Sequence, residues 1–167
     1  MSNTDLISTN PARGYEEIGR VTISNDQDVA TAVKAARSAF LKWRALGVAG
    51  RKPYFEKFIE LLKGRADEVA KLQTKEMGKP LNDSRGEVQG AIGWLEWQLE
   101  HAPDFLAVEV MDQYDDYQTE LHFEPFGVVA AIAPWNYPTH QMMLATMQQL
   151  IAGNTVVFKH SEECSLT

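Results

Sequence analysis

Two short stretches decide the fold of this chain: residues 128–138, Val-Val-Ala-Ala-Ile-Ala-Pro-Trp-Asn-Tyr-Pro, and residues 153–159, Gly-Asn-Thr-Val-Val-Phe-Lys. Every side chain from 128 to 133 is apolar, which is typical of a parallel strand buried on both faces. Residues 155–158 are also apolar or β-branched. The sequence therefore predicts two buried strands, the first ended by Pro134.

The segment between these strands predicts a helix over residues 139–151. Pro138 stands at its first turn, where the missing N–H of proline costs no hydrogen bond. Gly153 and Asn154 are residues that commonly end a helix. Strand, helix and strand in this order form a βαβ unit, so we expect an α/β fold with a parallel sheet.

Polar side chains follow both predicted strands. Trp135 and Asn136 leave the first strand, while Lys159 and Glu162 leave the second. The carboxyl ends of parallel strands meet at one edge of a sheet, where ligands of open α/β folds bind. An aromatic ring, an amide, a cation and a carboxylate at one edge predict a small-molecule site.

Each of these residues also has a purely structural interpretation. Asn136 could be the N-cap of the following helix, a position that asparagine favours. Lys159 could be an exposed lysine at a strand end, and Trp135 could serve in packing alone. The residue pattern by itself leaves these alternatives open.

The block from Pro134 to Pro138, its spacing to residues 153–157, and the lysine followed by Glu162 resemble the aldehyde dehydrogenase superfamily. Residues 10–14, 35–44 and 76–80 resemble that family's opening strand turn, its first long helix and the end of its second helix. Residues 76–80, together with Lys159-His160, are similar to the bacterial succinate-semialdehyde dehydrogenase branch. The first βα turn contains no glycine, so the ordinary Gly-rich dinucleotide fingerprint is absent.

The resemblance implies roles for individual residues. Asn136 matches the amide that stabilises the oxyanion formed from the aldehyde, and it is the catalytic residue we expect. The expected cofactor-binding residues are Ile132, Ala133, Pro134 and Trp135 along the nicotinamide-nucleotide channel, with Lys159 and Glu162 at the adenosine ribose. The cofactor would be NAD, with NADP as the alternative, because Glu162 would accept a 2′-hydroxyl and repel a 2′-phosphate.

The implied reaction is oxidation of a small aldehyde to a carboxylic acid, with succinate semialdehyde as one candidate substrate. The family's nucleophilic cysteine and general-base glutamate lie downstream of Thr167, so we expect this chain to be inactive alone. His160 and Cys164 depart from the family pattern. Cys164 has no evident base beside it, and we interpret it as a small buried residue rather than a nucleophile.

The expected fold is the N-terminal part of an aldehyde-dehydrogenase-like α/β fold. Residues 1–104 would form a strand turn and the helical part of the cofactor-binding domain. Residues 105–125 would form a two-stranded arm of the kind used in subunit association, with its turn near Asp115. Residues 126–167 would form the first βαβ unit of a nucleotide-binding sheet, truncated.

Periodicity places three helices before the arm. The first starts near Asn25, with an apolar face that includes Val29 and Trp43. The second begins after Pro53 and stops at Gly78, and the third ends at Pro103. Because their apolar faces need cover, we expect all three helices to pack against other elements.

Composition limits the remaining possibilities. The net charge is −7 and no basic stripe is present, so nucleic-acid binding is not expected. No stretch approaches the length of a membrane span. One cysteine fits a reducing cytoplasm. The four histidines lack the spacing of metal ligands, so no metal site is predicted.

Two other classes of function remain open. The chain could be a non-catalytic module that binds nucleotide or assembles with a full-length relative, or it could be a structural remnant without a ligand. An in-frame continuation of the gene encoding a Gly-rich turn, a cysteine and a glutamate would exclude the first. Saturable binding of an adenine nucleotide would count against the second.

Overall fold

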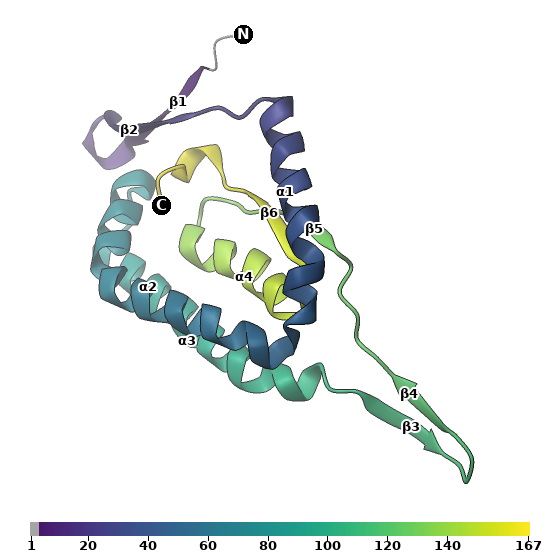
Figure 1. The fold of residues 1–167 in the computed structure, drawn as a ribbon. Helices are drawn as coiled ribbons and strands as arrows, with labels where there is room; N and C mark the ends of the chain where they lie inside the picture. Colours follow the sequence, from purple (N-terminus) through teal and green to yellow (C-terminus); the bar gives the residue numbers. More distant parts are fainter. Residues whose placement is uncertain (1–3) are drawn as a thin grey trace.

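The βαβ unit forms as predicted in the computed structural model of the chain, which describes residues 4–167 (Figure 1). In chain order the elements are β1 (Asp5–Asn10), the short 3-10 helix η1 (Pro11–Arg13), β2 (Glu16–Thr22), α1 (Asp26–Ala45), α2 (Gly47–Met77), α3 (Leu81–Phe105), β3 (Glu109–Gln113), β4 (Gln118–Leu121), β5 (Val128–Ile132), α4 (Pro138–Ile151), β6 (Thr155–Lys159) and the 3-10 helix η2 (Glu162–Cys164).

Strands β5 and β6 are parallel, with Val128 opposite Thr155 and Ile132 opposite Lys159. Helices α1 and α4 both contact this strand pair. The prediction that β5 is buried on both faces is wrong for this chain, because Ala130 and Ile132 are exposed. Within residues 4–167, β6 is the only strand that pairs with β5, so part of its apolar surface lacks cover.

Helix α4 begins at Pro138 and ends at Ile151, as predicted. Gly153 then adopts a φ of 100°, a conformation that side-chain-bearing residues rarely take. A Cβ atom at this position would also lie 3.1 Å from Nη1 of Arg51. Both the backbone and the close approach of Arg51 therefore require glycine at the end of α4.

Helix α1 starts where the sequence indicated. The Asn25 side chain accepts hydrogen bonds from the backbone N–H groups of residues 27 and 28, and the Asp28 carboxylate accepts one from the Asn25 N–H. The predicted apolar face is only half-buried, and Val29 is exposed. At the other end, Trp43 Nε1 donates to the Leu150 carbonyl at 2.9 Å, which joins the ends of α1 and α4.

Helices α2 and α3 pack against each other and against α4. Their contact holds the most deeply buried apolar side chains, among them Ala70, Val88 and Leu95. Both proline predictions were wrong: α2 begins at Gly47 with Pro53 inside it, and α3 continues past Pro103. Each proline removes one backbone hydrogen bond, a loss that the packing of these long helices tolerates.

The two-stranded arm predicted within residues 105–125 is present. Strands β3 and β4 are antiparallel, and the Tyr114 N–H donates to the Tyr117 carbonyl across the turn at 2.9 Å. Figure 1 shows the arm extending away from the rest of the chain. All residues of both strands are exposed.

The opening strand turn is also present, as β1 and β2. Glu76, at the end of α2, anchors it because its carboxylate accepts a hydrogen bond from Ser8 Oγ at 2.6 Å. The same carboxylate accepts the Leu166 N–H at 2.9 Å. One buried side chain therefore joins the first hairpin, the second helix and the segment after β6.

Candidate functional site

The carboxyl ends of β5 and β6 lie next to each other, as the sequence predicted. Ile132 is opposite Lys159 in the strand register, and the Ala133 N–H donates to the Lys159 carbonyl at 3.2 Å. The two segments that leave the sheet, 133–137 and 160–164, therefore start from the same edge. This edge is the candidate functional site.

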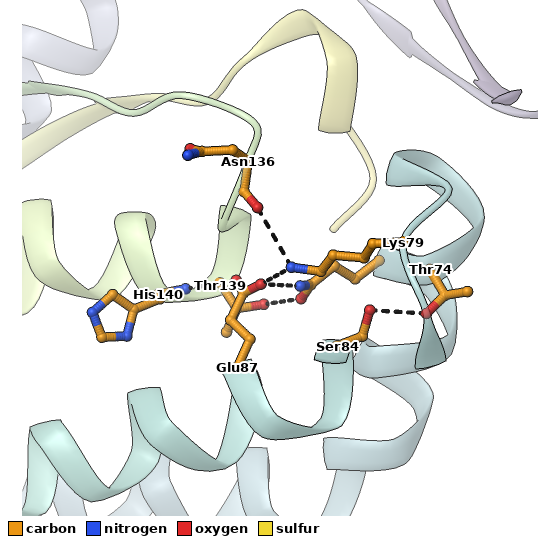
Figure 2. A network of polar contacts seen from close by, with 8 residues as sticks. Thr74, Lys79, Ser84, Glu87, Asn136, Thr139 and His140 are labelled. Atoms are coloured by element: carbon orange, nitrogen blue, oxygen red, sulfur yellow. Dashed lines mark hydrogen bonds and ion pairs between the residues drawn. The ribbon is translucent and has the colours of Figure 1, made fainter. Parts of the chain in front are cut away.

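Asn136 lies in the exposed loop between β5 and α4. The N-cap of α4 is Tyr137, and it makes no side-chain capping hydrogen bond. The interpretation of Asn136 as a helix cap is therefore wrong. Figure 2 shows its side-chain amide pointing away from the polar side chains beneath the loop, while its backbone carbonyl points toward them.

The residues predicted to line the nicotinamide channel differ in exposure. Ile132 is 74% exposed and Trp135 is 52% exposed, whereas Ala133 is buried. Pro134 is exposed as well. Trp135 is therefore no part of the core of residues 4–167, which removes the interpretation that it only serves packing within this chain.

Lys159 and Glu162 form an ion pair at 3.1 Å, and both side chains are more than 60% exposed. Lys159 Nζ also donates to the His160 carbonyl at 2.9 Å. The pKa of Glu162 is held below its ordinary value, first by its own backbone N–H and second by Lys159. The pair therefore presents a charged carboxylate and an ammonium group to solvent, a donor and acceptor set that suits ribose hydroxyls.

Cys164 is buried, as expected. Burial is the largest cause that raises the pKa of its thiol to about 11, and the charge of Glu76 adds to it. A thiol with such a pKa is almost entirely protonated at neutral pH and is a poor nucleophile. The structure thus supports a packing role.

A buried polar network beneath the Asn136 loop was not predicted from the sequence. Glu87 of α3 forms an ion pair with Lys79 and accepts a hydrogen bond from Gln73. Its Oε1 accepts the His140 N–H at 3.1 Å, and Thr139 Oγ1 donates to Gln73 Oε1 at 3.0 Å. Figure 2 shows Lys79, Glu87 and Thr139 converging from the segment after α2, from α3 and from the start of α4.

One sequence signal could have indicated this network. Glu87 lies on the same face of α3 as Ser84, Val88 and Ala91, all of which are buried. A charged residue inside the buried face of a helix needs a partner of opposite charge. The sequence does not say which cation that would be, since the partner is set by how the helices pack.

Within residues 4–167, no group of three or more His, Cys, Asp or Glu side chains is placed to hold a metal ion. None of the helices in this part of the chain has the length and hydropathy needed to cross a lipid bilayer.

Known proteins resemble the chain over nearly its whole length. A sequence model described as the aldehyde dehydrogenase family matches residues 1–167. The succinate semialdehyde dehydrogenase NAD(P)+ Sad of Escherichia coli (strain K12) is 32% identical over 95% of this chain. A glutarate-semialdehyde dehydrogenase of Pseudomonas putida (strain KT2440) is 34% identical over 93% of it.

A solved structure of a similar protein has the same fold over this region. Succinic semialdehyde dehydrogenase from Streptococcus pyogenes, in complex with NADP+, superposes with a TM-score of 0.86 at 27% identity, covering 95% of this chain and 35% of the other. The chain belongs to the aldehyde dehydrogenase family, as its site residues suggested. It spans about a third of the length of the curated relatives it matches, 34% and 32% for the two named above.

Proposed function

We propose that the protein carrying this chain is an NAD(P)-dependent dehydrogenase that oxidises aldehydes to carboxylic acids. The observation that carries the proposal is the exposed side-chain amide of Asn136 at the edge of the β5–β6 pair. In a chain of this family, that amide is placed where a substrate oxygen can approach it. Two relatives are named as succinate and glutarate semialdehyde dehydrogenases, so we propose an aldehyde that carries one carboxylate at its other end.

Asn136 would act when a cysteine thiolate supplied by the rest of the protein attacks the aldehyde carbon. The carbonyl π electrons move to the oxygen, and the Asn136 amide N–H donates to the oxyanion. A nicotinamide held along Ile132 to Trp135 would supply an acceptor for the hydride of this carbon, and water would then release the acid from the cysteine. A fixed amide donor stabilises the oxyanion because it needs no reorganisation as the charge develops.

The cofactor would lie along the edge of the sheet. We propose that Ile132, Ala133, Pro134 and Trp135 line the path of the nicotinamide nucleotide and that Lys159 and Glu162 hold the adenosine ribose. The fit rests on the exposed Lys159–Glu162 pair, which offers a donor and a charged acceptor. We propose NAD as the preferred cofactor, because the carboxylate of Glu162 would repel the 2′-phosphate of NADP.

We further propose a division of the chain and an assembly. Residues 1–104 would belong to the cofactor-binding domain, residues 126–167 would open its sheet, and residues 105–125 would form an arm that joins subunits of a homo-oligomer. The exposed strands β3 and β4 support the last point. A reducing compartment such as the cytoplasm fits the free thiol of Cys164.

The test is Asn136→Ala in the full-length protein, with Asn82→Ala as the control at an exposed amide on α3. Loss of one oxyanion donor should lower kcat by roughly 100-fold or more. The KM for NAD should change little, and Asn82→Ala should retain full activity. Steady-state and single-turnover kinetics, with semialdehydes and with both NAD and NADP, measure these effects.

Three results would contradict parts of this proposal. Unchanged single-turnover acylation in Asn136→Ala would remove the amide from the mechanism. A preference for NADP that persists in Glu162→Gln would remove Glu162 from cofactor selection. A full-length wild type that binds nucleotide without oxidising any aldehyde would favour the non-catalytic module.

A further inference from the structure

The N-terminus of α4 is capped by a side chain of another helix. The first N–H groups of any helix lack partners within it, and the N-cap Tyr137 supplies no side-chain acceptor. Glu87, which is 53 residues away on α3, accepts the His140 N–H instead. A carboxylate at a helix N-terminus is also favoured by the helix dipole. Glu87 therefore caps α4 across a tertiary contact.

This cap is buried and fully partnered. The Glu87 side chain is 1% exposed and the Lys79 side chain 17% exposed. One carboxylate oxygen accepts from the backbone of α4, and the other accepts from Lys79 and Gln73. Gln73 in turn accepts from Thr139. A buried charge with every partner in place holds its neighbours in one geometry.

Lys79 extends the network to the Asn136 loop. Its ammonium group donates to the Asn136 carbonyl at 3.4 Å and lies 4.6 Å from the ring centroid of Tyr137. Figure 2 shows the carbonyl of Asn136 directed toward Lys79 and its side-chain amide directed the other way. The backbone is therefore held on one side, and the amide is left free on the other.

We propose that Lys79 and Glu87 are positioning residues for the oxyanion-stabilising amide of Asn136. This inference rests on the proposed function. Glu87 sets where α4 begins, and Lys79 sets the orientation of the peptide that follows Asn136. A catalytic donor must be held within about 0.5 Å of its productive position. The Asn136 loop is exposed, so this network provides a constraint that the loop itself lacks.

The competing explanation is that the network only stabilises the packing of α2, α3 and α4. Both explanations predict a less stable variant. They differ in the coupling to Asn136, because a residue that acts through Asn136 has nothing left to position once that amide is removed. A double-mutant cycle in the full-length protein measures this coupling.

The main variant is Lys79→Met with Glu87→Gln. Both charges are removed together, because removing one would leave the other buried without a partner. The matched control is Lys63→Met with Glu96→Gln. That pair also joins α2 to α3, but its side chains are 52% and 45% exposed and it lies outside the network.

The network variant should lower kcat by about 10-fold or more, since a 1 Å misplacement of a catalytic group can cost up to 100-fold. The KM for NAD should stay within about two-fold, since the ribose pair is unaltered. Hydrogen exchange of the His140 amide should become faster. In the Asn136→Ala background the same network variant should lower kcat by less than about two-fold. The control pair should retain activity.

Each remaining outcome overturns the inference, and the outcomes are distinguishable. A wild type without activity overturns the proposed function and the inference together. An active wild type whose network variant loses kcat equally in both backgrounds overturns the inference alone. An unchanged kcat in a folded network variant does the same. If the double variant does not fold by circular dichroism, Lys79→Arg, which keeps a positive charge beside Glu87, repeats the cycle, with an expected kcat loss of about three-fold that disappears in the Asn136→Ala background.

Discussion

Cys164 is the only cysteine in the sequence, and its environment disfavours the reactive thiolate. It is 2% exposed, and its Sγ lies 4.0 Å from the Ser161 carbonyl. Burial raises the pKa of the thiol, and carboxylates on α2 and α3 raise it further. The folded protein is therefore more stable with Cys164 as the neutral thiol than with Cys164 as the thiolate.

This environment predicts a loss of stability at alkaline pH. The thiol has an ordinary pKa of 9.0 and a pKa of about 11 in the folded chain. Between these values the unfolded state loses its proton first, so the free energy of unfolding falls as the pH rises from 9 to 11 and is unaffected by this group below 9. The expected loss is about 2 to 3 kcal/mol.

The measurement is urea unfolding of the full-length wild type and of full-length Cys164→Ala at several pH values from 8 to 11. Lysine and tyrosine titrations are common to both proteins and cancel in the comparison. The stability of the wild type should fall more steeply with pH than that of the variant. Equal slopes would show that Cys164 titrates normally in the folded protein.

Local sequence rules point to some residues of the candidate site and miss others. Asn136, Lys159 and Glu162 were assigned to the candidate site because they stand at strand ends, and that rule needs only the order of residues along the chain. Lys79 and Glu87 were missed because their partners are 57 and 53 residues away. Those contacts depend on how α3 packs on α4, which no local pattern encodes.

At the scale of elements, Arg51 joins the ends of two helices. It lies on α2 with 4% exposure, and burial lowers the pKa of its guanidinium group. Nε donates to the Ile151 carbonyl at 3.2 Å, at the end of α4. Nη1 donates to the Trp43 and Arg44 carbonyls at 3.3 Å, at the end of α1. A cation at two helix C-termini is favoured by both dipoles.

We expect Arg51→Met to lower the free energy of unfolding by about 3 kcal/mol, because one buried and two partly buried carbonyls lose a charged donor. Lys52→Met is the control, since its side chain is half exposed and pairs only loosely with Glu56 at 3.9 Å. The control should change stability by less than about 0.5 kcal/mol. Urea unfolding of the full-length wild type and of both full-length variants measures these changes. Similar losses in the two would mean that Arg51 contributes no more than a surface charge.

Element boundaries were less predictable than the elements themselves. The start of α1 at Asn25 and the start of α4 at Pro138 followed from capping rules that act within one turn. The start of α2 and the end of α3 did not, because Pro53 and Pro103 lie inside helices. Proline marks a boundary only where packing does not continue the helix, and packing was not visible in the sequence.

At the scale of the whole molecule, apolar side chains remain on the surface around the sheet and the arm. Phe126 is 96% exposed and Ile132 74% exposed, close to β5. Leu121, the last residue of β4, and Phe123, two residues beyond it, are exposed as well. Strand β5 also pairs on one edge only within residues 4–167. Unpaired strand edges and exposed apolar patches favour association with other chains.

We therefore expect the 167-residue chain by itself to self-associate and to unfold without one sharp transition. Light scattering over a range of concentrations should show growth in mass, and Phe126→Ser with Ile132→Ser should reduce it. Leu41→Ser, which changes a 69% exposed side chain on α1 far along the sequence from β5, is the control and should have little effect. A concentration-independent monomer with a single cooperative urea transition would refute this expectation.

The link that Arg51 makes has a consequence for how the chain is made on the ribosome. Ile151, which supplies one of its acceptors, is synthesised 100 residues after Arg51. At translation rates of about 5 to 20 residues per second, that interval lasts on the order of 5 to 20 s. Throughout it the nascent α1–α2 segment holds a guanidinium group whose final partner does not yet exist. The contact between Arg51 and the end of α4 therefore forms late in synthesis. A pause or truncation before residue 151 leaves the Arg51 guanidinium group without its Ile151 acceptor.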